Sequence, residues 1–486
     1  MKFSTPEKMG ISSKNVLAFY QELEMQHLST NAVILSRGDT VFSECYWAPF
    51  HKDFKHRMYS VTKSFVSIAI GFCQQDGLLS LDDPLIKFFP EYAMPHHHSS
   101  TIREMLQMTT TLDKSGGWFS AAPEDRVAFY FEKSPQKNPD TLFSYDSAGS
   151  FMLCAVVERV TKMPFLKYLQ EKVLNQTGFS EDACCLQCPG GHSWGDSGLL
   201  CTARDLWRFA RFVLNKGSWD GKQYLNADYI TTATTPITPN NPYGFYNTHS
   251  VHGYGYQFWG APDGCFAAKG MGMQLAFCDP AHDFIFIINS NNQGDDLKCE
   301  PIYRALYTHI LPNLGEPLPE DPKAVETLHQ YLSERKLYFL RERTTSPFSS
   351  LISNKVFECD SNDMGIRWFR LSFESSEGTF TYENDQGEKE MRFGFGHNVF
   401  HKFPQDGYSD TVGSVSAPGN KYDAAFSADW PSERTLRIRV QIIDKYFGNL
   451  AILFGFRDEN TVSVRMVKAA EDFLKEYSGL LNAKAR

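Results

Sequence analysis

The change of hydrophobic pattern across one proline-rich segment constrains the fold of this chain more than any other feature of its sequence. The segment LPNLGEPLPEDP, at residues 311–322, is rich in proline and acidic residues, as is typical of a boundary or linker. Helical periodicities dominate before it, whereas beyond about residue 345 apolar and polar residues alternate as in half-buried strands. A length of 486 residues favours two or three domains. We predict a first domain at 1–315, a linker with a helix at 316–344 and a β-rich domain at 345–486.

The first domain is predicted to be an α/β domain of the α+β kind, in which one mostly antiparallel sheet surrounds an inserted helical region. A hairpin is expected around the turn Arg37-Gly38-Asp39. The predicted strands are 31–36, 40–47, 253–259, 265–269, 273–279 and 283–290. The predicted helices are 15–26, 64–75, 101–108, 150–162, 205–215 and 300–311. Thr202 and Asp205 form a capping box that opens the helix at 205–215.

The β-rich domain is predicted to be an antiparallel sandwich or barrel. Its expected strands are 365–373, 378–384, 435–443, 449–456 and 462–467, followed by a helix at 469–481. In the linker, Asp321 and Pro322 are a good N-cap and first position for a helix over 323–336. Trp368 and Phe369 are expected in the core and not in a ligand pocket.

Composition excludes several classes of function. The formal net charge of −9 offers no basic face for a nucleic acid. Neither a signal segment nor a run of about 18 apolar residues is present, which predicts a soluble, cytoplasmic protein without a membrane partner. The 11 cysteines are scattered, which favours free thiols.

Two groups of side chains raise the possibility of a metal site. Cys184, Cys185 and Cys188 lie close together, but no second Cys or His pair stands at a zinc-like spacing. The run of histidines at 96–98 is typical of a solvated loop. We therefore expect no metal and no cofactor.

Two serines compete for the role of nucleophile. Gly191-His192-Ser193-Trp194-Gly195 fits G-x-S-x-G, which requires a strand running into the turn and a helix starting at the serine. A Pro-Gly-Gly break precedes this motif and two more glycines follow it, so a loop is predicted around Ser193.

Ser60 and Lys63 form the other candidate, an S-x-x-K motif. The same spacing recurs at 134–137 and 333–336, but only Ser60 opens an apolar helix. The start of a helix has unpaired N–H groups that favour negative charge on a carbonyl oxygen. A lysine three residues on lies on the same face and, when desolvated, can accept the serine proton. We predict Ser60 as the nucleophile and Lys63 as its base.

These motifs, with others in a fixed order, resemble the serine β-lactamase and penicillin-binding-protein superfamily. The likeness is to its class C-like branch of esterases, D-aminopeptidases and 6-aminohexanoate-dimer hydrolases, and covers about residues 1–315. The phrases that carry it are YSVTKS (59–64), TIREMLQMTTTLD (101–113), FSYDSAGSFMLCAVVERVT (143–161), DSGLLCTARDLWRFARFVLNKG (196–217), GYGYQFW (253–259) and AAKGMGMQLAFCDP (267–280). The resemblance implies a β-lactamase/transpeptidase-like sheet flanked by helices, with a helical subdomain.

The resemblance also implies roles for individual residues. Ser60 would be acylated and Lys63 would activate it, while Tyr145 matches the tyrosine of the Y-x-N/S motif, which shares the proton transfers. Ser147 stands where many relatives carry Asn and would bind Lys63 or the substrate. The backbone N–H groups of Ser60 and Met271 would form the oxyanion hole.

The third motif of the family, K-T-G or H-x-G, corresponds best to Ala268-Lys269-Gly270. The basic residue stands in the middle place, and side chains alternate across a strand. This departure weakens the expectation that Lys269 holds a substrate carboxylate, and with it β-lactam or D-Ala-D-Ala chemistry. The loop around Ser193 would border the cleft, where His192 and Trp194 would contact substrate.

The predicted function is that of a serine hydrolase that acts through an acyl-enzyme on a small ester or amide. A non-turnover ligand-binding or sensor protein on the same fold is the alternative, suggested by the altered third motif and the additional β domain. The strands of that domain resemble the lipocalin-like barrels of some relatives, and it could shape the cleft, mediate dimers or hold an apolar ligand. No oligomeric state follows from the sequence.

Overall fold

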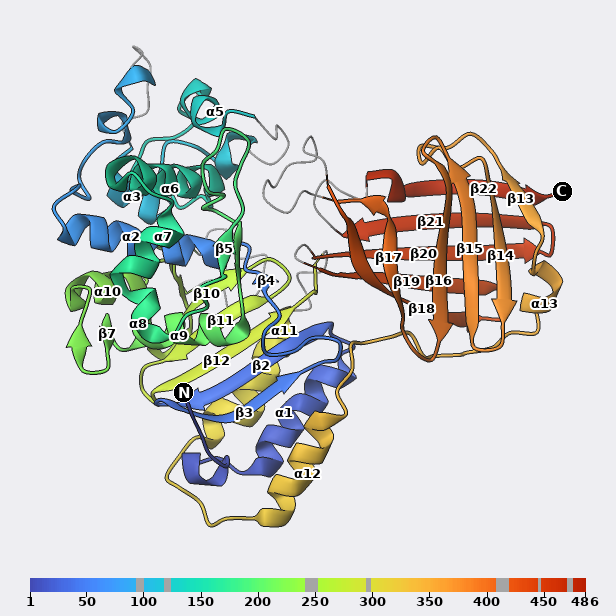
Figure 1. The fold of residues 1–486 in the computed structure, drawn as a ribbon, viewed down its shortest axis with the longest axis horizontal. Coiled ribbons are helices and arrows are strands. Elements are labelled where there is room, and N and C mark those ends of the chain that lie inside the picture. The colour runs from blue at the N-terminus through green and yellow to red at the C-terminus, as the bar shows by residue number, and fades with distance from the viewer. Residues whose placement is uncertain are drawn as a thin grey trace. The chain divides into compact units, whose positions relative to one another are not determined.

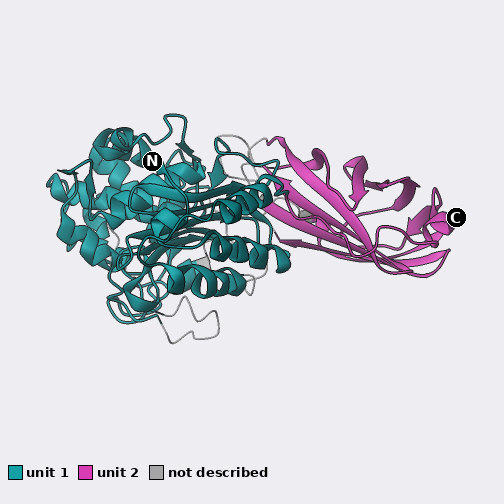
Figure 2. Ribbon diagram, turned by 90° about the horizontal axis from the view of Figure 1, so that it is seen from below, with its two compact units in different colours: residues 1–336, 411–414 teal, residues 337–410, 415–486 magenta. Residues whose placement is uncertain are grey.

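The chain forms two compact units, one from Met1–Lys336 and the other from Leu337 onward (Figures 1 and 2). A computed structural model describes residues 1–92, 100–117, 124–240, 252–293, 299–407, 419–444, 447–469 and 475–486. The histidine loop predicted at 96–98 lies outside these ranges. The helix predicted in the linker packs with the first unit, and the predicted boundaries of the first domain, the linker and the β-rich domain stay predictions.

A seven-stranded sheet organises the first unit, in the order β1-β3-β2-β12-β11-β10-β9. Its strands are β1 (Lys2–Phe3), β2 (Thr30–Arg37), β3 (Thr40–Tyr46), β9 (Trp259–Gly260), β10 (Phe266–Gly270), β11 (Gln274–Asp279) and β12 (Phe284–Ser290). All neighbours are antiparallel except β1 with β3. Since β2 and β3 form the hairpin and the helical region separates β3 from β9, the predicted insertion is confirmed.

Helices cover both faces of this sheet (Figure 1). One face carries α1 (Ser13–Met25), α11 (Cys299–Ala305) and the π-helical turn that follows it (Leu306–Ile310), with α12 (Pro322–Ser333) packed on α1. The other face carries α2 (Val61–Gln75) and α9 (Ala203–Leu214). The remaining helices are α3 (Ile102–Leu106), α5 (Arg126–Glu132), α6 (Ser147–Thr161), α7 (Phe165–Leu169), α8 (Asn175–Thr177) and α10 (Ala227–Thr234). Small ladders join β4 (His56–Arg57), β6 (Leu199–Cys201) and β5 (Cys184–Cys185), and β7 (Ser218–Trp219) with β8 (Lys222–Gln223).

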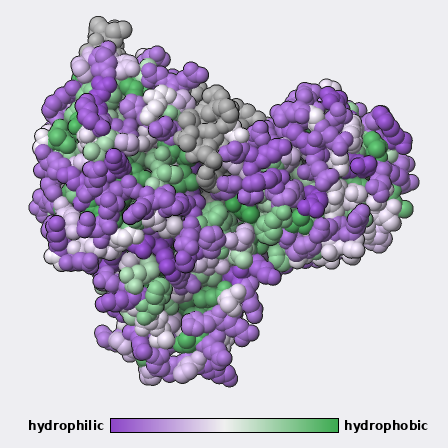
Figure 3. Space-filling model, viewed as in Figure 1, coloured by the Kyte–Doolittle hydropathy of each residue, from purple (hydrophilic) through white to green (hydrophobic). Residues whose placement is uncertain are grey.

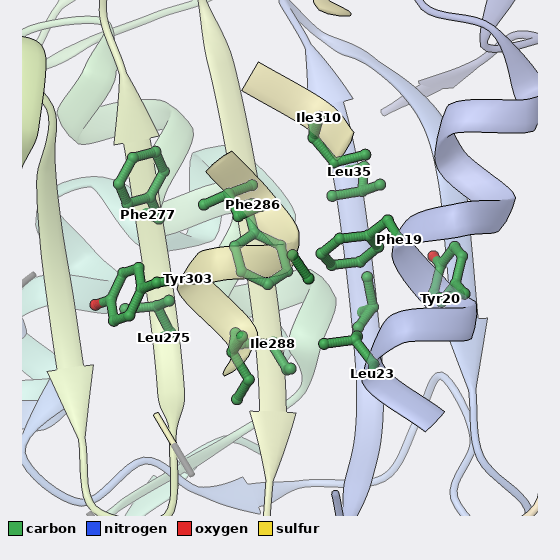
Figure 4. Close-up of a cluster of buried hydrophobic side chains, with 14 of the residues drawn as sticks. Phe19, Tyr20, Leu23, Leu35, Leu275, Phe277, Phe286, Ile288, Tyr303 and Ile310 are labelled. Atoms are coloured by element: carbon green, nitrogen blue, oxygen red, sulfur yellow. The ribbon is translucent and has the colours of Figure 1, made fainter. Parts of the chain in front are cut away.

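Alternation along the strands directs a large apolar cluster toward α1 and α11 (Figure 4). Leu275 and Phe277 of β11 are fully buried there, beside Phe286 of β12, against Phe19 of α1 and Tyr303 of α11. Each such side chain contributes about 1.5–3 kcal/mol by leaving water. This cluster fixes which residues of β10 and β11 face α1 and which face α2.

One strand prediction in the first unit is wrong. The run at 253–259 contributes only Trp259 to a strand, because the backbone turns at Gly253 (φ +88°) and Gln257 (φ +64°). Tyr254 is buried and bridges Thr238 and Trp259. The alternating aromatic residues of this run therefore belong to a tightly packed turn and not to a strand.

The second unit is a closed barrel whose strands are antiparallel except at one pairing. Of the two predicted architectures, sandwich or barrel, the structure has the barrel. Its sheet runs β16-β15-β14-β13-β22-β21-β20-β19-β18-β17, and a parallel pairing of β16 with β18 closes it. The strands are β13 (Val356–Cys359), β14 (Trp368–Glu374), β15 (Glu377–Asn384), β16 (Gly387–Phe395), β17 (Val399–Asp406), β18 (Lys421–Ser432), β19 (Thr435–Ile443), β20 (Phe447–Asp458), β21 (Thr461–Ala469) and β22 (Gly479–Ala485), with a short helix α13 (Ser349–Ile352).

Several aromatic side chains pack against one another in the described interior of the barrel. The rings of Phe369, Phe380 and Phe454 lie 5.2–5.8 Å apart, and the hydroxyls of Tyr382 and Tyr477 form a hydrogen bond of 2.7 Å. Phe369 is thus a core residue, as predicted. Its neighbour Trp368 is not, because alternation places it on the outer side, where its Nε1 donates to Glu383.

The helix predicted at 469–481 is wrong over its described part. A short 3-10 turn at Lys475–Tyr477 leads into β22, while residues 470–474 lie outside the described ranges. Strand β22 pairs with β21 on one side and with β13 on the other. The two ladders supply backbone hydrogen bonds along both edges, which outweigh the local preference for a helix.

The cysteines and the surface agree with the composition of the chain. All 11 cysteines are free thiols, as predicted. Hydrophilic residues cover most of the face seen in Figure 3. Within the described ranges, no helix combines the length and apolarity needed to span a membrane. No cluster of three or more His, Cys, Asp or Glu side chains is arranged to hold a metal there either.

The capping box of α9, predicted from the sequence, can be tested by its contribution to stability. Thr202 Oγ1 accepts a hydrogen bond of 3.1 Å from the Asp205 N–H, and Asp205 Oδ2 accepts one of 3.0 Å from the Thr202 N–H. Thr202→Ala should lower the free energy of unfolding by about 1 kcal/mol, measured by urea denaturation. Thr231→Ala on exposed α10 is the control and should change it by less than about 0.5 kcal/mol. Equal effects would contradict the capping role.

Candidate active site

Ser60 lies where a strained turn leads into the buried helix α2. Tyr59, just before it, is a buried residue with φ +48°, a left-handed conformation that is unusual for a side chain other than glycine. Its hydroxyl accepts a hydrogen bond of 2.8 Å from Gln293 Nε2, which ties the turn to the segment after β12. Ser60 is the N-cap of α2 and half-buried, so its hydroxyl lies beside the positive end of the helix.

Lys63 lies directly beside the Ser60 hydroxyl. Its side chain is in the interior, with the residue only 1% exposed. Nζ donates hydrogen bonds to Ser60 Oγ at 2.9 Å and to the main-chain carbonyl of Asp196 at 2.7 Å. A base within hydrogen-bond reach of a serine hydroxyl is the arrangement that activates a nucleophile.

Tyr145 approaches the same lysine from the turn before α6. The Lys63 Nζ lies 5.1 Å from the centroid of the Tyr145 ring, which also stacks on Trp259 at 5.5 Å. Asp146, the N-cap of α6, fixes this turn through hydrogen bonds from the Gly149 N–H and the Thr110 hydroxyl. Burial raises the pKa of the Asp146 carboxyl, and those bonds oppose the rise. The fold thus brings Ser60, Lys63 and Tyr145 together.

The end of β10 lies against the start of α2. A Cβ placed on Gly270 would lie 2.3 Å from the Met58 carbonyl oxygen and 3.1 Å from the Ser60 nitrogen, so only glycine fits. Met271 follows immediately. In the described part of the chain, neither the Ser60 N–H nor the Met271 N–H donates a hydrogen bond to a protein acceptor. Two unused N–H donors at this edge can stabilise an oxyanion.

Ser147 is buried at the first position of α6, but its predicted bond to Lys63 is not formed. Its N–H donates to Ser115 Oγ at 2.8 Å. Its hydroxyl is buried and has no hydrogen-bond partner among the described residues. A contact of this hydroxyl with substrate stays a prediction.

Lys269 does not join the site. It pairs with Leu275 across the β10–β11 ladder, and Leu275 belongs to the apolar cluster under α1 and α11. Its Nζ accordingly lies 6.0 Å from the centroid of the Tyr303 ring, on the face opposite Ser60. Side chains alternate between the two faces of a strand, and this alternation places Lys269 on the face away from Ser60.

The G-x-S-x-G segment is a loop before β6 and α9, as predicted. Ser193 is 5% exposed, and no helix begins at it. His192 Nδ1 lies 2.9 Å from Glu158 Oε2. Trp194 is buried, and the guanidinium carbons of Arg57 and Arg126 lie 4.4 and 4.6 Å from the centroid of its ring. Substrate contacts of His192 and Trp194 stay predictions, since the contacts seen are within the protein.

The sequence-based reasoning missed three charged residues that surround this loop. Arg57 is fully buried in β4, Arg126 opens α5, and Asp196 is fully buried between Ser193 and β6. Arg57 carried no signal in the sequence, because it belongs to the polar run HKDFKHR at residues 51–57, in which a single charged residue does not stand out. Arg126 and Asp196 are far apart in sequence and carried no signal either.

Comparison with known proteins places this geometry in context. The family model described as Beta-lactamase matches residues 18–308. The 6-aminohexanoate-dimer hydrolase of Paenarthrobacter ureafaciens is 24% identical over 299 residues, which cover 57% of this chain and 76% of that protein.

Two solved structures share the fold. A protein from Bacillus anthracis, described as a candidate 6-aminohexanoate-dimer hydrolase, has a TM-score of 0.53 at 18% identity, covering 65% of this chain and 88% of that one. An octameric penicillin-binding protein homologue from Pyrococcus abyssi has a TM-score of 0.50 at 14% identity, covering 96% and 99%.

The close approach of β10 to α2 predicts the effect of a single methyl group. Gly270→Ala should lower the free energy of unfolding by about 1–3 kcal/mol, because the added Cβ forces the strand and the helix start apart. Gly315→Ala is the matched control, since nothing lies within 4 Å of the Cβ position there. Urea denaturation of both variants decides the point, and an equally small change in both would refute the tight contact.

Proposed function

We propose that this chain, which belongs to the beta-lactamase family and is a hydrolase of that family, works through an acyl-enzyme at Ser60 on a small ester or amide. The observation that carries the proposal is the 2.9 Å hydrogen bond between Lys63 Nζ and Ser60 Oγ at the start of a buried helix. Two unused backbone N–H groups beside the same hydroxyl support it.

In the proposed acylation, Ser60 Oγ attacks the carbonyl carbon and its proton passes to neutral Lys63. The carbonyl oxygen becomes an oxyanion and accepts hydrogen bonds from the N–H groups of Ser60 and Met271. These donors are held in place before the reaction by helix α2 and strand β10, so little reorganisation is needed as charge develops.

Collapse of the tetrahedral intermediate breaks the bond to the leaving group, which must gain a proton. Tyr145 is the group proposed to pass it on, because its ring lies against Lys63. Water then attacks the acyl-enzyme, the carboxylic acid leaves, and Ser60 regains its proton. The reaction consumes one water for each ester or amide bond that is cleaved.

The position of Lys269 narrows the proposed substrate. A lysine at the third motif would hold a carboxylate, but this one lies on the opposite face, against Tyr303. Trp259, Tyr145 and Tyr254 instead form an aromatic group beside Lys63. We propose a small ester or amide without a carboxylate next to the scissile bond. The relative from Paenarthrobacter ureafaciens is named for the hydrolysis of a 6-aminohexanoate dimer.

Ser60→Ala should abolish turnover of a p-nitrophenyl ester, because no other group would supply the attacking oxygen. Ser193→Ala is the matched control and should retain activity. A fluorophosphonate should label the wild-type peptide that contains YSVTKSF, located by mass spectrometry. An adduct on Ser193, or activity in Ser60→Ala, would overturn the assignment. A single stoichiometric burst without further turnover would instead favour the ligand-binding alternative.

Tyr145→Phe tests the proton transfer to the leaving group. The variant should reduce kcat/KM for an amide by about 10²–10⁴-fold, the usual range for loss of a general acid. The loss for a p-nitrophenyl ester should be smaller, because nitrophenolate leaves without a proton. Tyr224→Phe, on the β7–β8 hairpin, is the control. Equal losses for the amide and the ester would contradict the proposed role.

A further inference from the structure

A buried cluster of charged side chains lies beside Lys63, formed by Arg57, Arg126, Trp194 and Asp196. Arg57 comes from β4, Arg126 from the first turn of α5, and the other two residues from the loop before β6. All four are less than a tenth exposed. The two guanidinium groups lie on the Trp194 ring, at 4.4 and 4.6 Å from its centroid. Through these contacts the loop is attached to both β4 and α5.

The same two arginines also contact the next part of the loop, at Asp196 and Ser197. Arg57 Nε donates to the Ser197 carbonyl at 3.0 Å and Nη2 donates to Ser197 Oγ at 3.0 Å. Asp196 Oδ1 lies 4.0 Å from Arg126 Nη1. The Asp196 carbonyl is thereby aimed at Lys63 Nζ, which it meets at 2.7 Å. One residue thus supplies a hydrogen-bond acceptor through its backbone and a charge through its side chain.

The Asp196 carboxyl is an acidic group that lies near three cations, Lys63, Arg57 and Arg126. It is fully buried, and its oxygens accept no hydrogen bond from another described residue. Burial raises the pKa of this carboxyl, whereas the charges of Lys63, Arg126 and Arg57 oppose the rise. The titratable groups that face it come from several elements: Lys63 (α2), Arg57 (β4), Arg126 (α5), Cys154 (α6), Cys185 (β5) and Cys188 (the loop after β5). The three thiols have raised pKa values because of burial and stay neutral.

We propose that Asp196 is a positioning residue for Lys63: its carbonyl fixes Nζ next to Ser60, and its carboxylate, which lies 4.0 Å from Arg126, sets how readily Nζ holds a proton. The inference rests on the proposed function, in which Lys63 accepts the Ser60 proton. Without the carboxylate, Lys63 would lie beside two arginines, Arg57 and Arg126, with no anion in the cluster. The ammonium form of Lys63 would then be less stable.

Asp196→Asn keeps the shape of the side chain and removes its charge. Because Lys63 would then lose its proton at lower pH, the acidic limb of the pH profile of kcat/KM should move to lower pH by about one unit or more. The readout is hydrolysis of a p-nitrophenyl ester by the full chain across pH, with the rate of fluorophosphonate labelling of Ser60 as a second measure. A folded variant, checked by circular dichroism, whose acidic limb does not move would overturn the proposal.

Asp205→Asn is the matched control, since Asp205 is equally buried but serves the capping box of α9. It should change stability and leave the limb in place. An equal shift in both variants would mean that general loosening of the fold is responsible, and would overturn the proposal.

A second pair of variants decides the question if Asp196→Asn does not fold. Arg126→Met removes one positive charge from the cluster, so the ammonium form of Lys63 is favoured and the limb should move to higher pH. Arg126→Lys keeps the charge and should leave the limb near its wild-type position. Identical limbs in the two variants would overturn the proposal.

The labelling result separates this inference from the proposed function. An adduct on Ser60 together with unshifted limbs overturns the positioning role alone. The absence of an adduct on Ser60 in the wild-type chain overturns the proposed function and this inference with it.

Discussion

The contact between the end of β10 and the start of α2 is the constraint on which the site depends. The Gly270 Cα lies so close to the Met58 carbonyl and the Ser60 nitrogen that no side chain fits between them. Tyr59 adopts a left-handed conformation directly before Ser60, and Gln293 holds its hydroxyl. Strain of this kind persists only where the surroundings determine it. The sheet, packed through its apolar cluster under α1, supplies that rigidity, so the N–H groups that we propose as the oxyanion hole are fixed before any substrate arrives.

A buried lysine is costly unless something offsets its charge, and here the offset is not a direct ion pair. Lys63 Nζ meets an uncharged carbonyl, while the carboxylate of the same residue lies among Lys63, Arg57 and Arg126. A direct Lys–Asp pair would hold the proton firmly on the lysine and make it a poor base. A hydrogen bond to the carbonyl fixes the position of Lys63 Nζ without the full electrostatic attraction of a carboxylate. In the mechanism we propose, this separation of the two effects within Asp196 lets Lys63 be fixed in place and still accept a proton.

The features that could be read from the sequence were local ones. An S-x-x-K motif at the start of an apolar helix, the hairpin at Gly38 and the capping box at Thr202 each depend on neighbouring residues, and the structure has the predicted helix, hairpin and cap. The face of Lys269 also followed from simple alternation. The errors arose where residues far away in the sequence determine the local structure. For example, β22 is a strand because it pairs with β13 and β21. Asp196 was missed for the same reason, since its cations come from three separate elements.

The two units differ in whether they contribute residues to the proposed reaction. Every group in the proposed reaction, from Arg57 to Met271, belongs to the first unit, which can therefore form the reacting constellation from its own residues. In the second unit, rings such as Phe369, Phe380 and Phe454 pack against one another in the barrel interior, and Tyr382 and Tyr477 satisfy each other's hydroxyls. Contacts between closely packed rings stabilise an interior of this kind. The proposed reaction is built from residues of the first unit alone, and the suggestions that the barrel holds an apolar ligand, shapes the cleft or mediates dimers stay predictions.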